Sequence, residues 1–116
     1  DYACNNMPPT WPHGRDCEAL TFAWLDRAAS RATKPFEREH VTPYVRNHAE
    51  ARKANLPCPV AGVEKHRWTL DNARDLAFLR ELFARLPAGP AAFNWRVPLA
   101  VVAADPALAH MVESRV

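Results

Sequence analysis

Glycine is scarce in this sequence, and its scarcity excludes one kind of binding site. The 116 residues include only three glycines, Gly14, Gly62 and Gly89, which are scattered singly. Loops that cradle phosphates need successive glycines, because backbone N–H groups must approach the phosphate oxygens closely. The chain therefore contains no loop of the kind that holds a nucleoside triphosphate.

Cysteine is equally sparse, and its spacing excludes the common structural uses. Cys4, Cys17 and Cys58 are odd in number and widely separated, with no CxxC pair. We expect free and mostly buried thiols, because an unpaired cysteine behaves as a small hydrophobic residue. Neither a disulfide nor a zinc site is predicted.

Long apolar runs and an excess of one charge are also missing. No apolar stretch approaches the roughly 20 residues that span a bilayer, and residues 1–6 have no features of a signal peptide. Fifteen Lys and Arg against thirteen Asp and Glu leave a net charge of +2, too balanced to favour a nucleic-acid partner. We expect a cytoplasmic protein that binds neither membrane nor nucleic acid.

What is present is the composition of an ordinary globular domain. Hydrophobic residues make up 48% and charged residues 24% of the chain, which fits one domain over residues 1–116. Short alternating stretches predict strands before Met7 and over Asp16–Phe22, and a helix over Phe22–Ala32 begins after Thr21 as its N-cap. In that helix, an apolar face is formed by Phe22, Leu25 and Ala29, with Trp24 or Ala28 at its edge.

The second half is predicted to be mainly helical. The pattern predicts a short helix over Glu37–His48, with Pro43 in a turn or an early helical position, and then a loop at Leu56–Val60. A strand over Lys65–Leu70 and a helix over Asn72–Leu86 are predicted next. The last predicted helix, Val97–Ala104, ends at Asp105-Pro106 and is followed by a short helical tail.

Asp71 lies at the predicted junction between a strand and a helix. Ligands collect beyond the carboxyl ends of strands in α/β sheets, so this carboxylate is a candidate ligand for Mg²⁺, with phosphates supplying other oxygens. Asp is also a preferred N-cap residue. Spacing alone favours the cap.

Two further groups of titratable residues precede Asp71 in the sequence. The run from Glu37 to His40 holds a histidine beside carboxylates, which suits a general base or a sugar-binding group, although a solvated turn is the commoner explanation. A strand would place Asp16 and Glu18 on one side, where they would accept hydrogen bonds from sugar hydroxyls or lie exposed on an edge strand.

Four stretches, in one order, resemble a known family. Residues 1–14, DYACNNMPPTWPHG, resemble its DYxSNxxPPTYPxG, and residues 14–18, GRDCE, resemble GxDVE. Residues 38–44, REHVTPY, are identical to a third family motif, and residues 67–76, RWTLDNARDL, resemble RWTxDxxxDL. The chain thus resembles the C-terminal portion of the cytidylyltransferase-like proteins of spore coat and other surface polysaccharide biosynthesis.

The resemblance implies a fold, a reaction and a cofactor. The fold is the nucleotide-diphospho-sugar transferase type, a three-layer α/β/α sandwich with a mixed sheet, here without its N-terminal part. The reaction is attack of an oxygen of a sugar or sugar acid on the α-phosphate of CTP, with release of pyrophosphate and with Mg²⁺ as cofactor. Asp71 matches an acidic position used for Mg²⁺, whereas a second acidic position in acid-sugar relatives is Thr69 here.

The resemblance also implies substrate-binding residues and an oligomer. Asp16, Glu18, Arg38 and His40 fall where the family builds its sugar-facing wall, whereas no catalytic residue is identified. The glycine- and arginine-containing loop that grips CTP in the family has no counterpart in these residues, so we expect this chain alone to be inactive. Relatives dimerise through this half, and we expect a homodimer.

Two alternatives remain open. One is an interaction module, derived from the same fold, that supplies a dimer surface and no chemistry. The other is a small sugar-binding protein.

Overall fold

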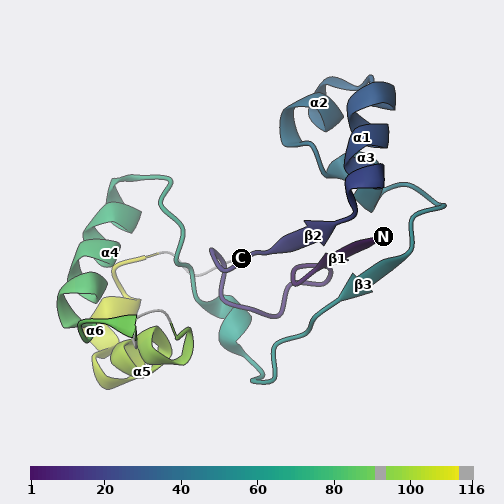
Figure 1. Ribbon diagram of the computed structural model, residues 1–116. Helices are drawn as coiled ribbons and strands as arrows, with labels where there is room; N and C mark the ends of the chain where they lie inside the picture. Colours follow the sequence, from purple (N-terminus) through teal and green to yellow (C-terminus); the bar gives the residue numbers. More distant parts are fainter. Residues whose placement is uncertain (91–93, 113–116) are drawn as a thin grey trace. The chain divides into compact units, whose positions relative to one another are not determined.

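The computed structural model describes residues 1–90 and 94–112, and its contacts divide the chain into two units (Figure 1). The first unit comprises Asp1–Trp11 and Arg15–Val63, and the second comprises Pro12–Gly14 and the chain from Glu64 onward. Among the described residues, no helix has the length and apolar character needed to cross a membrane.

A small mixed sheet forms one end of the first unit. Its central strand is β1 (Tyr2–Cys4), which pairs antiparallel with β2 (Glu18–Leu20) and parallel with β3 (Lys53–Asn55). The two predicted strands of this region are confirmed as β1 and β2, whereas β3 has no periodic signal that sequence analysis detected. The register places Cys4 opposite Glu18, and alternation then brings Tyr2 and Glu18 to the same face.

Three helices complete the first unit. Helix α1 (Phe22–Arg31) begins after Thr21, whose side chain accepts a hydrogen bond from the Trp24 N–H, so the predicted N-cap is confirmed. The single helix predicted over Glu37–His48 is wrong, because the structure contains α2 (Pro35–His40) and α3 (Pro43–Arg46). Pro43 has no N–H to continue a helix and disfavours helical geometry in the preceding residue, and it becomes the first residue of α3.

The break between α2 and α3 is a strained γ-turn centred on Val41. Its φ is 66° and its ψ is −57°, and the Thr42 N–H donates to the His40 carbonyl at 2.7 Å. Left-handed backbone is unfavourable for a β-branched residue, and this type of γ-turn is rare. Among the described residues other than glycine, Val41 alone has a positive φ.

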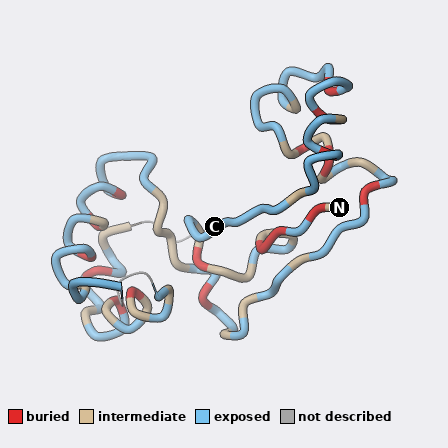
Figure 2. Tube along the Cα trace, in the orientation of Figure 1, coloured by how far each residue is buried: buried red, intermediate tan, exposed pale blue. Residues whose placement is uncertain are grey.

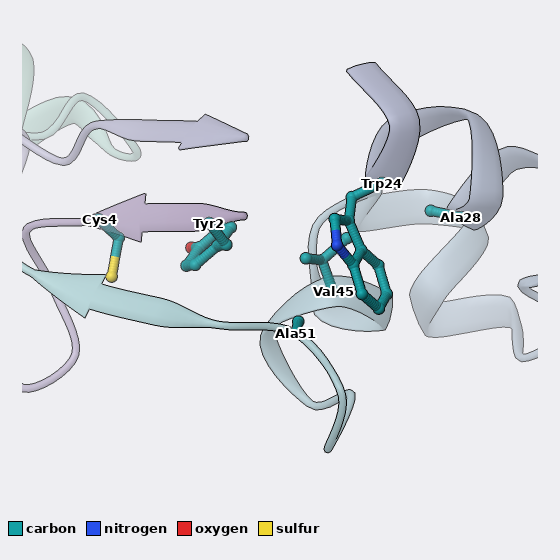
Figure 3. Packing of buried hydrophobic residues seen from close by; sticks show 6 residues of the cluster. All are labelled: Tyr2, Cys4, Trp24, Ala28, Val45 and Ala51. Atoms are coloured by element: carbon teal, nitrogen blue, oxygen red, sulfur yellow. The ribbon is translucent and has the colours of Figure 1, made fainter. Parts of the chain in front are cut away.

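The core of the first unit lies between the sheet and α1 and α3. Figure 3 shows Trp24 of α1 beside Val45 of α3. The cluster is formed by six buried residues: Tyr2, Cys4, Trp24, Ala28, Val45 and Ala51. Helix α1 therefore buries Trp24 and Ala28, while Phe22, Leu25 and Ala29 are exposed. The predicted apolar face of this helix is thus an outer face.

The second unit packs three helices after a short 3-10 turn, η1 (Val63–Lys65). Helix α4 (Ala73–Arg85) confirms the predicted helix, and α5 (Arg96–Ala104) and α6 (Pro106–Ala109) confirm the C-terminal helix and its tail. Their core is formed by Phe78, Leu82, Val102 and Leu108.

One predicted strand is absent from the second unit. Over Lys65–Leu70 the described backbone forms a single bridge, between Arg67 and His13, instead of a strand. Gly14, with a φ of 109°, follows this bridge, and a Cβ there would lie 2.6 Å from the Trp68 carbonyl oxygen. Only glycine permits this close approach of two backbone segments.

Candidate functional site

A polar network surrounds Glu18 at the start of β2. The Tyr2 hydroxyl donates to Glu18 Oε2 and accepts from Arg46 Nη1 at 3.1 Å. Arg46 Nη1 also donates to Asn6 Oδ1 at 2.9 Å and lies 3.5 Å from Glu18 Oε2. Because one guanidinium nitrogen carries two hydrogens, the last contact is a charge interaction beside two hydrogen bonds. The Thr42 side chain also favours the charged form of Glu18 and helps to lower the pKa of its carboxyl group.

The network keeps Glu18 ionised. Burial alone would raise the pKa of Glu18, but hydrogen bonds from Tyr2 and Thr42 and the charge of Arg46 outweigh it and lower the pKa. Burial and the bond to Glu18 raise the pKa of Tyr2, which therefore stays a neutral donor. The pKa of Arg46 is raised, since its partners outweigh its own desolvation.

The ionised carboxylate has unused acceptor capacity that faces solvent. Its side chain is 31% exposed. A carboxylate offers about four lone-pair positions, and the Tyr2 hydroxyl occupies one of them. The arrangement is chemically suited to accept a hydrogen bond from a ligand hydroxyl, because the carboxylate is fixed in place and remains accessible.

Asn5 holds the segment that leads into β2. Its side-chain amide donates to the Arg15 carbonyl and accepts from the Cys17 N–H, both at 2.8 Å. Asp16, between these two residues, is exposed and lies outside β2. The predicted strand therefore does not extend to Asp16, and the strand alternation that would pair it with Glu18 does not apply.

Arg38 and His40 have contacts of their own on α2. Arg38 Nη1 donates to the Ala29 carbonyl near the end of α1 at 2.8 Å. The His40 ring packs against Phe36 with centroids 4.7 Å apart and lies 3.9 Å from the Glu39 carboxylate. The four candidate sugar-binding residues thus have different surroundings, and Glu18 alone among them belongs to the network with Tyr2 and Arg46.

Asp71 is not the N-cap of α4, although its position in the sequence suggested that role. The N-cap of α4 is Asn72, which forms a capping box with Asp75, so the N-cap interpretation of Asp71 is wrong. The Asp71 carboxylate is 66% exposed and accepts from Arg67 Nη2 at 2.9 Å. Its backbone N–H donates to Asp75 Oδ2 at 2.9 Å.

Asp71 fits a magnesium site only as one ligand of several. Mg²⁺ prefers oxygen ligands in an octahedral arrangement, often one or two carboxylates with phosphates and water. Across residues 1–90 and 94–112, no group of three His, Cys, Asp or Glu is placed to hold a metal. The exposed carboxylate is therefore a possible single ligand, and the remaining ligands would have to come from elsewhere.

Sequence reasoning missed most of the residues around Glu18. Tyr2, Asn6 and Thr42 lie inside motifs that resemble the family, and Arg46 follows the third motif by two residues. Their participation depends on strand pairing between β1 and β2 and on the position of α3, neither of which local sequence patterns encode. For Tyr2, Asn6 and Thr42, the available signal was that each lies inside one of these motifs.

Comparisons with known proteins support the fold class. No family model and no curated protein matches the chain. Among solved structures it is similar to a cytidylyltransferase from Leptospira borgpetersenii serovar Hardjo-bovis (strain JB197), with a TM-score of 0.83 and 25% sequence identity. The match covers 93% of this chain and 44% of that chain. The chain therefore has a mixed α/β fold of the cytidylyltransferase type and spans less than half of that protein's length.

Proposed function

We propose that this chain is part of a nucleotidyltransferase of the cytidylyltransferase type, which activates a sugar or sugar acid with CTP for surface or spore coat polysaccharide biosynthesis. The observation that carries the proposal is the likeness to a solved cytidylyltransferase over 93% of the chain. The four motifs of the sequence support the narrower assignment to polysaccharide biosynthesis.

The proposed reaction joins the sugar to CMP. A sugar hydroxyl oxygen forms a bond to the α-phosphorus of CTP, the bond from that phosphorus to the β-phosphate oxygen breaks, and pyrophosphate leaves. The hydroxyl proton passes to a base that the described residues do not identify. Glu18 would bind another hydroxyl of the same sugar and thereby orient it, with Tyr2 and Arg46 holding the carboxylate still.

The other expected site residues enter the proposal with smaller roles. Asp16, Arg38 and His40 are exposed and available to a sugar, and Asp71 would supply one oxygen to Mg²⁺. CTP would be held mainly by residues outside this chain, because the described glycines form no phosphate loop. We also expect a homodimer.

Pyrophosphate release by the complete gene product tests the proposal, with CTP, Mg²⁺ and a panel of neutral and acidic sugars. Glu18→Gln should lower kcat/KM for the sugar about tenfold to a hundredfold, because it replaces a charged acceptor by a neutral one. Glu64→Gln, an exposed glutamate in η1, is the matched control and should leave kcat/KM unchanged. Absence of turnover with every sugar, or full activity of Glu18→Gln, would contradict the proposal.

The alternative, a non-catalytic interaction module, is favoured by one observation. The outer face of α1 exposes Phe22 and Leu25. In this alternative the complete gene product would associate with itself and show no turnover.

A further inference from the structure

A second polar side chain, Asn6, lies beside Glu18. Asn6 follows the end of β1 by two residues, and its Oδ1 accepts a hydrogen bond from Arg46 Nη1 at 2.9 Å. The same nitrogen lies 3.5 Å from Glu18 Oε2, so Asn6 and Glu18 are neighbours around one guanidinium group. Figure 2 shows that the chain is largely exposed along β2, which begins with Glu18, and largely buried along β1.

Arg46 fixes the orientation of the Asn6 amide. A guanidinium group only donates hydrogen bonds, so the amide presents its oxygen to Arg46 and directs its nitrogen, Nδ2, elsewhere. Within the described part of the chain, no acceptor is hydrogen-bonded to Nδ2. Asn6 is half-buried, and Nδ2 is not among the described polar atoms that are buried without a partner, so it is accessible to solvent.

The two side chains offer one acceptor and one donor. The ionised Glu18 carboxylate only accepts, and its side chain is 31% exposed, whereas Nδ2 of Asn6 only donates. A hydroxyl group can do either. Two hydroxyls on adjacent carbons of a sugar therefore match the pair, because one donates to Glu18 while the other accepts from Asn6.

Charge decides which chemical group this pair refuses. The carboxylate of a sugar acid, placed here, would face the negative charge of Glu18 and would have no hydrogen to donate to it. Arg46 offsets little of this repulsion, because it already lies beside Glu18 and both hydrogens of Nη1 are taken by Tyr2 and Asn6. The pair thus selects a neutral, hydroxylated edge of the sugar, and the carboxylate of a sugar acid would be bound elsewhere.

We propose that Glu18 and Asn6 together bind two adjacent hydroxyls of the sugar, and that Asn6 thereby determines specificity for a neutral diol edge. This inference rests on the proposed function and adds Asn6 to it. Both side chains hold the sugar, and neither takes a proton.

Pyrophosphate release by the complete gene product tests the inference. The sugar that turns over is compared with its monodeoxy analogues, one for each hydroxyl apart from the one that attacks phosphorus. Removal of either of two hydroxyls on adjacent carbons should lower kcat/KM of the wild-type protein about tenfold. One of these losses should shrink to about twofold or less in Asn6→Asp, and the other should shrink in Glu18→Gln.

Asn6→Asp isolates the hydrogen-bond donor. The new carboxylate keeps an oxygen for Arg46 but has lost both N–H groups, so the contact with Arg46 is retained. Asn47→Asp is the matched control: Asn47 is exposed at the end of α3, one residue after Arg46, and its substitution adds the same charge without changing the pattern of losses. Circular dichroism melting of each variant establishes that it remains folded.

An NMR titration of the wild-type protein supplies a second measurement that needs no turnover. The side-chain amide signals of Asn6 are assigned by their absence in Asn6→Asp. They should shift when the same sugar is added, and they should shift much less, at equal saturation, with the analogue that lacks the hydroxyl coupled to Asn6.

Three results would overturn this inference and leave the proposed function intact. They are turnover with the same loss for each analogue in every variant, coupling of the two residues to hydroxyls on non-adjacent carbons, and Asn6 amide signals that do not move at saturating sugar. Absence of turnover with every sugar would instead contradict the proposed function, and this inference would fall with it.

Discussion

The guanidinium group of Arg67 holds the carboxylate of Asp75 with two hydrogen bonds, from Nε at 3.0 Å and from Nη2 at 2.9 Å. The same carboxylate accepts from the backbone N–H groups of Asp71 and Asn72. The Asp75 side chain is 2% exposed, so water has little access to it, and these four N–H groups are the hydrogen-bond donors that satisfy its carboxylate. A buried carboxylate satisfied in this way fixes the start of α4 relative to the segment that precedes it.

Asp75→Asn should lower the melting temperature by about 5 °C or more, because it removes the buried negative charge that pairs with Arg67 and replaces one of the two acceptor oxygens by an amide donor. Asp71→Asn is the matched control: it removes a carboxylate that contacts the same arginine but is 66% exposed, and it should have little effect. Equal melting temperatures for Asp75→Asn and the wild-type protein would contradict this assignment.

The same ion pair predicts a pH dependence. Hydrogen bonds from Arg67 and from the backbone of Asp71 hold the pKa of Asp75 well below its ordinary value of 3.8. The stabilisation is therefore fully present above the unfolded pKa and is lost as the pH falls from there through the folded pKa. The stability difference between wild type and Asp75→Asn should be constant near neutrality and shrink below pH about 4, as measured by urea unfolding at a series of pH values.

Gly14→Ala should destabilise the protein much more than Gly62→Ala. Both glycines have a positive φ, 109° and 80°, so each alanine has a backbone cost of about 1–2 kcal/mol. A Cβ at Gly14 would also meet the Trp68 carbonyl oxygen at 2.6 Å, whereas nothing lies within 4 Å of one at Gly62. Each variant's loss in free energy of unfolding is measured against the wild-type protein. The amount by which the loss for Gly14→Ala exceeds that for Gly62→Ala is the cost of the clash with Trp68. Equal losses would show that the backbone next to the His13–Arg67 bridge tolerates a side chain.

The elements that sequence analysis predicted correctly are those whose signals are local. Thr21 caps α1 through the Trp24 N–H three residues away, and α4 was predicted from an apolar repeat that lies within the helix itself, Ala73–Arg85. The network of Glu18 is different, because Tyr2 and Arg46 are 16 and 28 residues away in the chain. Local periodicity contains no information about such pairs, so the role of Arg46 was missed.

The errors also have physical causes. Residues Lys65–Leu70 have the short, partly apolar pattern of a strand, but a strand requires a partner along its length, and the described chain offers one bridge, at His13. The face of α1 was predicted from Phe22, Leu25 and Ala29, whereas the larger Trp24 and its neighbour Ala28 occupy the core. Periodicity finds an apolar face without telling which of two apolar faces is covered within the subunit.

Val41→Gly should make the subunit more stable by about 1 kcal/mol. The strain of a non-glycine residue at this φ costs about 1–3 kcal/mol, and the greater freedom of glycine in the unfolded chain offsets about 0.5–1 kcal/mol of the relief. Val41→Ala retains a Cβ at positive φ and should gain less. Urea unfolding, at a protein concentration low enough for the chain to be monomeric, measures both effects. If Val41→Gly were less stable than the wild-type protein, the turn would not be strained.

Asp71→Asn separates a metal ligand from a simple partner of Arg67. If Asp71 supplies an oxygen to Mg²⁺, the variant should require a Mg²⁺ concentration about tenfold higher or more for half-maximal pyrophosphate release, since a neutral amide oxygen is a poorer ligand for a hard cation. Direct titration of Mg²⁺ by calorimetry, in the presence of CTP, should show the same loss of affinity. Asp26→Asn, an exposed aspartate on α1, is the control for the loss of one negative charge. Because Asn72 is the N-cap of α4, a change in Mg²⁺ dependence would not arise from a lost helix cap. An unchanged Mg²⁺ requirement would instead restrict Asp71 to its exposed ion pair with Arg67.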